Sequence, residues 1–284
     1  MKGDSYSVNK NDQHPSYFDL TGLTIAVTGG AGVLCSGISR ALLNAGARVA
    51  VLDLDVNNAR KIMSGVDSNP DLAIEYCDVL DREKVETAME NVIKRFGNID
   101  VLINGAGGNH PEATTDQIRT FFEIPPEAIK FVFNLNILGT IIPSQVFGRH
   151  MAETGTGSIL NISSMCADRP LTRVLAYSAA KAGVSNFTKW LAVHMAQEYS
   201  PLIRVNAISP GFFLTEQNRF LLTNPASGNL TPRGEAILDH TPMRRFGNPD
   251  DLIGAVMWLL SPSASFVSGV VIPIDGGFSA FSGV

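Results

Sequence analysis

Two side chains four residues apart could carry out proton transfer. Tyr177 and Lys181 open a long helical pattern in the run YSAAK, and this spacing places both on one face of a helix. A free phenol has a pKa of about 10, and lowering it by ~3 units takes about 4 kcal/mol of preferential phenolate stabilisation. One cation about 4 Å away supplies ~4 kcal/mol at an effective dielectric constant of about 20. Tyr177 and Lys181 therefore form a candidate acid–base pair, the alternative being an ordinary amphipathic surface pair.

A glycine-rich segment, TGGAGVLCSG (28–37), follows an apolar run and precedes a helical pattern. Gly29 and Gly32 let backbone N–H groups approach a pyrophosphate, and the helix N-terminus adds positive potential. Asp53 lies 21 residues after Gly32, the spacing at which a carboxylate meets the 2′-hydroxyl of the adenosine ribose. Because no cation is available nearby for a 2′-phosphate, the sequence predicts NAD rather than NADP. The alternative is a merely structural turn between strand and helix.

Two further strand ends offer contacts to the same ligand. Asp78 and Val79 end the third apolar run, where a side-chain acceptor could meet an adenine amino group. Asn104 and Ala106 lie in NGAG at the end of the fourth run, whose glycines permit close backbone approach. Carboxyl ends of parallel strands meet at one edge of a sheet, so these residues should converge with the glycine turn.

The elements that must position these residues follow an alternating pattern. Apolar, β-branched runs predict seven parallel strands, and the amphipathic stretches between them predict crossover helices. The predicted strands are 24–28, 48–53, 72–77, 100–104, 158–163, 203–209 and 270–275. Asn248 is expected to cap a helix that begins at Pro249. Long loops at about 107–126 and 211–234 overhang the edge where substrate sites are built. The sequence predicts a single-domain, Rossmann-type, doubly wound α/β fold.

Composition narrows the class of protein. The chain has 284 residues, 45% hydrophobic and 17% charged, which suits one domain from 20 to 284 after a polar arm at 1–19. A net charge of −5 without a basic run argues against nucleic acid as a partner and favours a small-molecule substrate. The polar N-terminus lacks the apolar core of a signal peptide, and no stretch reaches the roughly 18 apolar residues of a membrane span. A cytoplasmic protein is expected.

Cysteines and histidines indicate neither a disulfide framework nor a metal site. Cys35, Cys77 and Cys166 are odd in number, far apart and without CxxC spacing, and the five histidines lack metal-ligand spacing. Cys166 could suggest a thiol nucleophile, because it follows Ser164 by two residues. No base is evident beside it, however, so a buried inert thiol is favoured.

From about Leu20 to the C-terminus, the chain resembles the classical short-chain dehydrogenase/reductase family. The family's TGxxxGxG turn corresponds to the run beginning at Thr28, with Val33 and Cys35 at its second and third glycines and Leu34 between them. A Cβ at Val33 narrows the approach to the phosphates, whereas Cys35 is small enough to keep helix and strand close. The resemblance implies that this turn, Val33 and Leu34 included, contacts a nicotinamide cofactor.

The same resemblance gives roles to other residues. Ser164, 13 residues before Tyr177, takes the position of the catalytic serine, which orients the substrate oxygen and stabilises developing charge; Ser163 is the weaker candidate. Asn136 matches the asparagine that holds a water near the lysine in a proton relay, its alternative being a locally satisfied helix residue. Tyr177 and Lys181 also contact the cofactor. The segment that binds the nicotinamide carboxamide corresponds to Pro210, Gly211, Phe213 and Thr215.

Within the family, TGGAGVLCS and NGAGGNHPEATT resemble the subgroup of D-mannonate oxidoreductases, or fructuronate reductases. The resemblance implies NAD(H)-dependent interconversion of D-mannonate and D-fructuronate by a homotetramer or homodimer. A sugar acid needs a cation for its carboxylate and polar groups for its hydroxyls. The candidates besides Ser164 are Asn109, His110, Arg169, Arg173, Gln217, Asn218 and Arg219, with no basis for choosing among the arginines. The alternatives are a dehydrogenase of a neutral polyol or keto sugar, and a catalytically idle NAD-binding module.

Overall fold

Seven parallel strands form one sheet in the order β3-β2-β1-β4-β5-β6-β7 in the computed structural model, which describes residues 17–214, 219–224 and 227–283. The strands are β1 (Thr24–Thr28), β2 (Arg48–Asp53), β3 (Leu72–Tyr76), β4 (Val101–Asn104), β5 (Gly157–Ile162), β6 (Ile203–Pro210) and β7 (Val271–Ile274). Each predicted strand is confirmed to within one residue at either end. The predicted doubly wound α/β fold is therefore correct.

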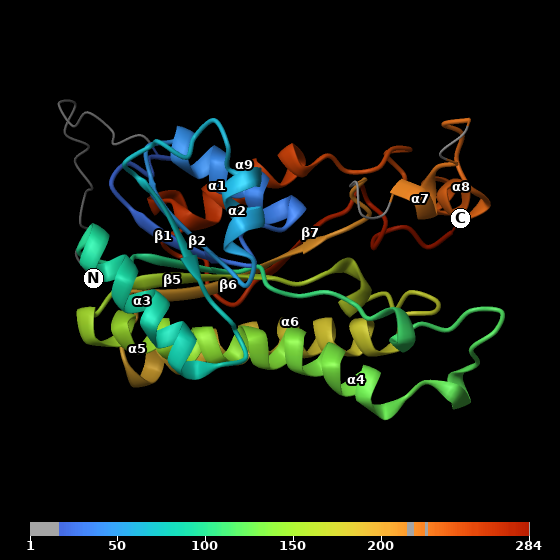
Figure 1. The fold of residues 1–284 in the computed structure, drawn as a ribbon, viewed down its shortest axis with the longest axis horizontal. Helices are drawn as coiled ribbons and strands as arrows, with labels where there is room; N and C mark the ends of the chain where they lie inside the picture. Colours follow the sequence, from blue (N-terminus) through green and yellow to red (C-terminus); the bar gives the residue numbers. More distant parts are fainter. Residues whose placement is uncertain (1–16, 215–218, 225–226, 284) are drawn as a thin grey trace, which may run out of the picture.

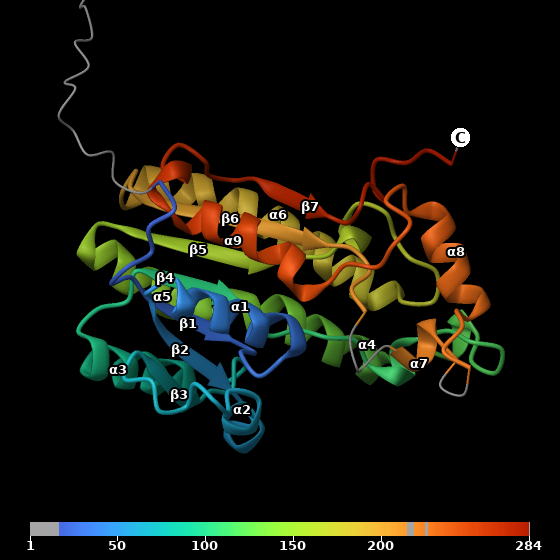
Figure 2. The same cartoon turned by 90° about the horizontal axis from the view of Figure 1, so that it is seen from above.

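Helices cover both faces of the sheet (Figure 1). One layer holds α1 (Val33–Asn44), α2 (Val56–Ile62) and α9 (Ile253–Leu260). The opposite layer holds α3 (Arg82–Phe96), α4 (Pro126–Phe133), α5 (Gly139–Thr154) and α6 (Leu175–Glu198). The remaining two, α7 (Arg219–Leu222) and α8 (Pro232–His240), lie beyond the carboxyl ends of the strands (Figure 2).

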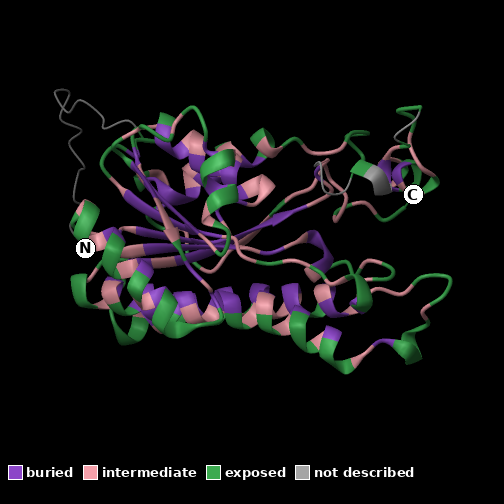
Figure 3. Cartoon of the chain, viewed as in Figure 1, coloured by how far each residue is buried: buried purple, intermediate pink, exposed green. Residues whose placement is uncertain are grey.

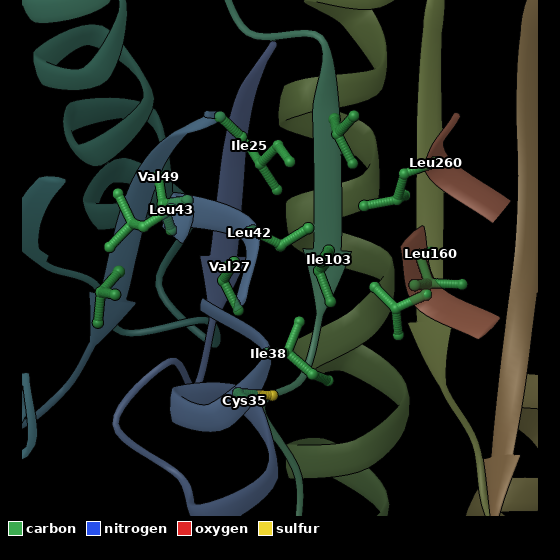
Figure 4. Close-up of a cluster of buried hydrophobic side chains, with 14 of the residues drawn as sticks. Ile25, Val27, Cys35, Ile38, Leu42, Leu43, Val49, Ile103, Leu160 and Leu260 are labelled. Atoms are coloured by element: carbon green, nitrogen blue, oxygen red, sulfur yellow. The ribbon is translucent and has the colours of Figure 1, made fainter. Parts of the chain in front are cut away.

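Alternating strand residues supply the two cores on either side of the sheet. Ile25 and Val27 pack toward α1, whereas Ala26 between them faces the α3–α5–α6 layer. The central strands β1, β4, β5 and β6 are consequently buried on both faces, as Figure 3 shows, whereas the edge strands β3 and β7 are only partly buried. Figure 4 shows the first core, in which Ile38 and Leu42 of α1 point toward the sheet. This packing fixes the place where each strand ends, and so the place of the residues that follow.

Two capping arrangements define the helix ends around the site. Asn248 accepts from the N–H of Asp250 at 3.2 Å, and Asp251 accepts from the N–H of Asn248 at 2.8 Å. The expected helix start at Pro249 is thus a 3₁₀ turn, Pro249–Leu252, that leads directly into α9. A second short turn, Met165–Ala167, follows β5 and is capped by Ser164.

A π-helical turn, Asn134–Leu138, joins α4 to α5 and makes one helical run over 126–154. By length and composition alone this run is apolar enough to cross a membrane, which corrects the expectation that no stretch qualifies. Half of its most apolar window is buried inside the structure, and α5 packs on β4 and β5. A core helix of a globular domain passes the same test, so the run is weak evidence for a membrane segment.

The order of the strands reverses direction between β1 and β4. The chain runs outward from β1 to β3 and then returns to the other side of β1 at β4. In doubly wound sheets ligands bind in the crevice at such a switch point, beyond the carboxyl ends of the strands. Both long loops lie at this end, 107–126 with two 3₁₀ turns and 211–234 with α7 and the start of α8.

Candidate active site

The turn after β1 approaches the end of β4 closely. Gly29 has a φ of 61°, and a Cβ added there would lie 2.7 Å from Cα of Ala106, so only glycine fits. Thr28 Oγ1 accepts from the N–H of Gly105 at 3.2 Å, which ties the two strand ends together. Gly32 then precedes α1 in an extended conformation. The turn therefore presents backbone at the switch point, as a pyrophosphate site requires.

Asp53, at the end of β2, is held by backbone donors. One carboxylate oxygen accepts from the N–H of Ala31 at 2.9 Å, and the other from that of Asp55 at 3.0 Å. Each oxygen keeps a lone-pair direction for a further donor, such as a ribose hydroxyl. The carboxylate faces a cavity of about 330 Å³ whose lining contains no lysine or arginine. A 2′-phosphate would meet uncompensated negative charge there.

Six of the predicted cofactor residues line this one cavity. They are Gly29, Gly32, Asp53, Asp78, Val79 and Ala106. Val33 and Leu34 begin α1 outside the lining, and Asn104 points away from it. Asn104 is buried and donates to Ser144 Oγ and to Asn161 Oδ1, both at 2.9 Å. Its side chain therefore holds β4 to β5 and α5 and makes no contact with the cavity.

Sequence reasoning missed several lining residues. Asn58, from α2, and Leu135, from the π-helical turn, both face the cavity, as does Cys77 at the end of β3. Asn58 could have been predicted from the sequence, because it stands one helical turn after Asp55, the N-cap of α2. Leu135 could not have been predicted, because a π turn depends on how α4 and α5 pack.

Cys35 fills space that a larger residue after β4 would take. A Cβ added at Gly105 would overlap Cys35 Sγ and would approach the carbonyl oxygen of Thr28 to 2.8 Å. Cys35 is buried, and burial raises the pKa of its thiol to about 12. Cys35 stands where the family's turn has a glycine. Because Gly105 has no side chain, Cys35 fits beside it and α1 stays close to β4.

Tyr177 and Lys181 lie on one face of α6, as predicted. Lys181 is buried, its Nζ donates to the carbonyl of Ile162 at 2.7 Å, and it lies 5.7 Å from the centre of the Tyr177 ring. Burial lowers the pKa of Lys181 to about 8. The ammonium group is therefore directed at a strand end and the ring of Tyr177.

Burial also shifts the pKa of the Tyr177 hydroxyl. It raises the pKa of Tyr177 above its ordinary value, Cys166 adds to the rise, and a hydrogen bond with Ser164 opposes it. The sequence-based expectation of a lowered pKa does not hold for the protein alone, because burial of the hydroxyl raises the pKa of Tyr177. The phenol consequently stays protonated at neutral pH.

Two adjacent serines after β5 have different surroundings. Ser163 is buried, and its Oγ is 3.2 Å from the carbonyl of Lys181 and 2.6 Å from Ser185 Oγ. Ser164 is half-buried, and its Oγ accepts from the N–H of Cys166 at 3.4 Å. Ser164 is therefore the serine with an accessible hydroxyl beside Tyr177, which agrees with the preference for it over Ser163. Burial raises the pKa of the Cys166 thiol, as expected of an unreactive cysteine.

Asn136 joins the π-helical turn to the loop after β4. Its Nδ2 donates to the carbonyls of Gly108 and Val132, both at 2.7 Å, and its Oδ1 accepts from the N–H of Gly108 at 3.1 Å. A Cβ added at Gly107 would lie 2.7 Å from Asn136 Oδ1 and 3.1 Å from Lys181 Nζ. Asn136 and Lys181 thus flank the same glycine.

The segment after β6 lies partly in the core. Phe213 is buried, and its ring packs against Gly247 so closely that a Cβ there would lie 2.7 Å away. Gly211 approaches Asp275 in a similar way, and its N–H donates to the carbonyl of Ile274 at 2.9 Å. Pro210 ends β6. Thr215, Gln217 and Asn218 lie outside the described residues.

The candidate substrate residues differ in their hydrogen-bond partners and in their exposure. Asn109 donates to Thr114 Oγ1 at 2.9 Å, and His110 Nδ1 accepts from the N–H of Glu112 at 3.2 Å, so both brace their own loop. Arg169 donates to the carbonyl of Ser279 at 3.2 Å. Arg219 is exposed on α7. Arg173 lines a separate cavity of about 450 Å³ beside Cys166.

Neither metal-binding clusters nor disulfides occur in the described part of the chain. No group of three or more His, Cys, Asp or Glu side chains there could hold a metal ion. Cys35, Cys77 and Cys166 are all buried free thiols.

The doubly wound sheet, the glycine turn and the Tyr177–Lys181 face at its switch point define a nucleotide-dependent oxidoreductase. A family profile described as enoyl-(acyl carrier protein) reductase matches residues 30–279. The chain belongs to the short-chain dehydrogenase/reductase family and is an oxidoreductase that acts on CH–OH groups.

Similar proteins cover nearly the whole chain. An uncharacterised oxidoreductase of Bacillus subtilis, UxuB, is 44% identical over 95% of this chain and 99% of its own. A crystal structure of a candidate D-mannonate oxidoreductase from Haemophilus influenzae, with bound NAD, is 42% identical with a TM-score of 0.85, over 94% of this chain and 98% of that one. The 5-keto-D-gluconate 5-reductase of Escherichia coli is 30% identical over 92% of this chain and 96% of its own.

Proposed function

We propose that the protein is an NAD(H)-dependent oxidoreductase that interconverts D-mannonate and D-fructuronate. The observation that carries the proposal is that Gly107, which lines the Asp53 cavity, is flanked by Asn136 and Lys181. Tyr177 lies on the same helix face as Lys181 and shares a hydrogen bond with Ser164. The candidate D-mannonate oxidoreductase and the 5-keto-D-gluconate 5-reductase support a keto sugar acid as the substrate class.

NAD fits the residues at the cavity. Gly29 lets the turn after β1 lie against Ala106, so that backbone lines the cavity, and Asp53 offers carboxylate oxygens to the ribose in a lining free of cations. The relative from Haemophilus influenzae binds NAD. When bound, the cofactor supplies the hydride that reduces the ketone or accepts it in the reverse reaction.

The residues of the chain supply orientation and the proton. Ser164 donates a hydrogen bond to the substrate oxygen, and the protonated Tyr177 delivers a proton to that oxygen as it gains negative charge. Lys181 stabilises the phenolate left on Tyr177, and Asn136 holds the loop that borders Lys181. A tyrosine that burial keeps protonated suits reduction of the ketone at neutral pH.

Steady-state kinetics with a matched pair of substrates tests the substrate class. D-fructuronate and neutral D-fructose are compared with NADH and with NADPH. We expect kcat/KM to be at least tenfold higher for D-fructuronate, because a charge-assisted Arg–carboxylate contact is worth roughly 1.5 to 3 kcal/mol. NADH should outperform NADPH because of Asp53. Equal use of D-fructose contradicts the sugar-acid assignment, and equal use of NADPH contradicts the cofactor assignment.

We propose in addition that the enzyme works in the cytoplasm as a homotetramer or homodimer formed through its long helices. Trp190, Val193 and Tyr199, on or just after α6, are each 57% exposed. Trp190 and Tyr199 line a hollow of about 1000 Å³ between α5 and α6, which a second copy of the chain would cover. Sedimentation at micromolar concentration should show a dimer or tetramer, and a monomer alone contradicts this assembly.

A further inference from the structure

A turn after the last strand is closed by one carboxylate at the end of the molecule where the strands terminate. The carboxylate of Asp275, which follows β7, accepts from the N–H of Gly277 at 2.9 Å and from that of Ser279 at 2.8 Å. The hydroxyl of Ser279 donates to the same carboxylate. Gly276 and Gly277 have φ values of 64° and 87°, a conformation that favours glycine and lets the chain reverse here. We refer to residues 275–281 as the C-terminal turn.

Aromatic rings hold the C-terminal turn against two other segments. The centre of the Phe278 ring lies 5.3 Å from that of Phe212, which follows β6 by two residues, and 4.6 Å from that of His240, which ends α8. The centre of the Phe281 ring lies 5.1 Å from the same His240 ring, so His240 contacts two rings of the turn. Figure 2 shows α8 and the chain end at the same end of the molecule. The turn is therefore attached to α8 and to the segment after β6.

An exposed arginine joins this turn to the loop that carries Ser164. Arg169 Nε donates to the carbonyl of Ser279 at 3.2 Å, a contact between residues 110 positions apart in the chain. The N–H of Arg169 donates to the carbonyl of Met165 at 3.0 Å, and the N–H of Ala167 donates to that of Ser164 at 2.9 Å. The side chain of Arg169 therefore links the short turn that begins after Ser164 to the C-terminal turn.

Close packing does not by itself fix the C-terminal turn. A cavity of about 350 Å³ borders the turn and is lined in part by Asp275, Gly276 and Gly277. All three residues are only half-buried. Because space remains on this side, hydrogen bonds and ring contacts decide where the turn lies. The hydrogen bond from Arg169 then helps to fix the distance between this turn and the loop of Ser164.

We infer that Asp275 and Arg169 are positioning residues, which together hold the loop of Ser164 in place relative to α8 and the segment after β6. The inference rests on the proposed function, in which Ser164 donates a hydrogen bond to the substrate oxygen. Asp275 keeps the turn closed, so that the carbonyl of Ser279 stays within reach of Arg169. A catalytic group that is displaced by about 1 Å can lose roughly 10²-fold in turnover. Loss of either side chain should therefore lower kcat, although the chemistry is left to Ser164 and Tyr177.

Steady-state reduction of D-fructuronate by NADH compares Arg169→Met and Asp275→Asn with Arg95→Met. The control is matched, because Arg95 is also exposed and donates to a backbone carbonyl, that of Leu72 at 2.6 Å, at the amino end of β3. Asp275→Asn keeps the shape of the side chain but replaces one acceptor oxygen by a donor, which opposes one backbone N–H of the turn. Each of the two variants should lower kcat roughly 10-fold and change KM and NADH binding far less. Arg95→Met should behave as the parent.

Two further variants test whether the side chains act through one connection. The double variant of Arg169→Met with Asp275→Asn should lose no more kcat than Asp275→Asn alone, because both changes break the same link. Arg169→Lys retains a donor and should recover part of the loss. Amide hydrogen exchange without substrate should be roughly 2- to 10-fold faster over 164–169 in Arg169→Met and in Asp275→Asn, as the loss of one hydrogen bond allows, and unchanged in Arg95→Met.

The outcomes separate this inference from the proposed function. A kcat and an exchange rate that stay at the parent's values in both variants refute the positioning role, as does a double variant whose losses multiply. If Arg169→Met instead raises KM for D-fructuronate with unchanged kcat and exchange, Arg169 contacts the substrate carboxylate, and the inference is wrong while the function stands. If the parent does not reduce D-fructuronate, the proposed function fails, and the exchange rates over 164–169 still confirm or refute the link.

Discussion

At the scale of single residues, Gly107 and Gly108 give a matched pair of tests. An added Cβ at Gly107 meets Asn136 Oδ1 at 2.7 Å and Lys181 Nζ at 3.1 Å, whereas at Gly108 the nearest atom is Leu135 Cδ2 at 3.9 Å. Asn136 cannot yield freely, because three hydrogen bonds hold its amide. Gly107→Ala should therefore lower kcat by roughly 10- to 100-fold, since small misplacements of catalytic groups are that costly.

The control for that prediction is Gly108→Ala, which keeps the backbone groups that bind Asn136. Kinetics of both variants with D-fructuronate and NADH, alongside their melting temperatures, provide the comparison. A Gly107→Ala enzyme as active as Gly108→Ala would show that Asn136 and Lys181 need not stand where the structure has them.

Lys181 should leave a signature in the pH dependence of stability. Its folded pKa of about 8 lies below the ordinary 10.5, so between these values the unfolded chain binds more protons than the folded one. Stability from this group therefore rises with pH through that window, by about 2 kcal/mol from pH 8 to pH 10. Urea unfolding of the parent and of Lys181→Met at both pH values measures it. A difference between the two proteins that is constant with pH would contradict the buried, depressed lysine.

The direction of the Tyr177 pKa shift could not be predicted from spacing. Sequence places Tyr177 and Lys181 on one helix face, and that geometry suggested a lowered pKa. Burial of the hydroxyl is a tertiary property, and it reverses the sign of the pKa shift.

At the scale of elements, the contact between α1 and β4 rests on a pair of residues. Gly105→Ala should destabilise the fold by about 1 to 3 kcal/mol, because its methyl group overlaps Cys35 and crowds the carbonyl of Thr28. Cys35→Gly in the same chain should recover part of this loss, since the backbone clash with Thr28 persists. A double-mutant cycle on urea unfolding measures the coupling. Strictly additive effects would mean that Cys35 and Gly105 do not share this space.

Strands were the most predictable elements, because the central strands are buried on both faces and the sequence shows this as continuous apolar runs. The helical run over 126–154 was less predictable. Its π turn at Asn134–Leu138 arises where Asn136 bonds across to Gly108, a contact distant in sequence. The cofactor site was predicted in part. Gly29 and Asp53 line the cavity as expected, whereas Val33, Leu34 and Asn104 do not.

At the scale of the whole molecule, two halves of the chain meet at one switch point of the sheet. Residues before β4 supply most of the lining of the Asp53 cavity, and Gly105, Ala106, Gly107 and Leu135 complete it. The half after β4 also presents Ser164, Tyr177 and Lys181. Beyond both, α8 and the loop over 107–126 lie at the same end of the molecule (Figure 2). Binding of the cofactor should therefore survive loss of the chemistry, because separate strand ends supply the two.

The most direct measurement compares the parent with Tyr177→Phe in the reduction of D-fructuronate by NADH, with identification of the product. We expect the parent to oxidise NADH and form D-mannonate. Tyr177→Phe should lose roughly 10²- to 10⁴-fold in kcat, the typical contribution of a positioned acid, while binding NADH as the parent does. Undiminished turnover by Tyr177→Phe, or a parent that forms no D-mannonate, would contradict the account.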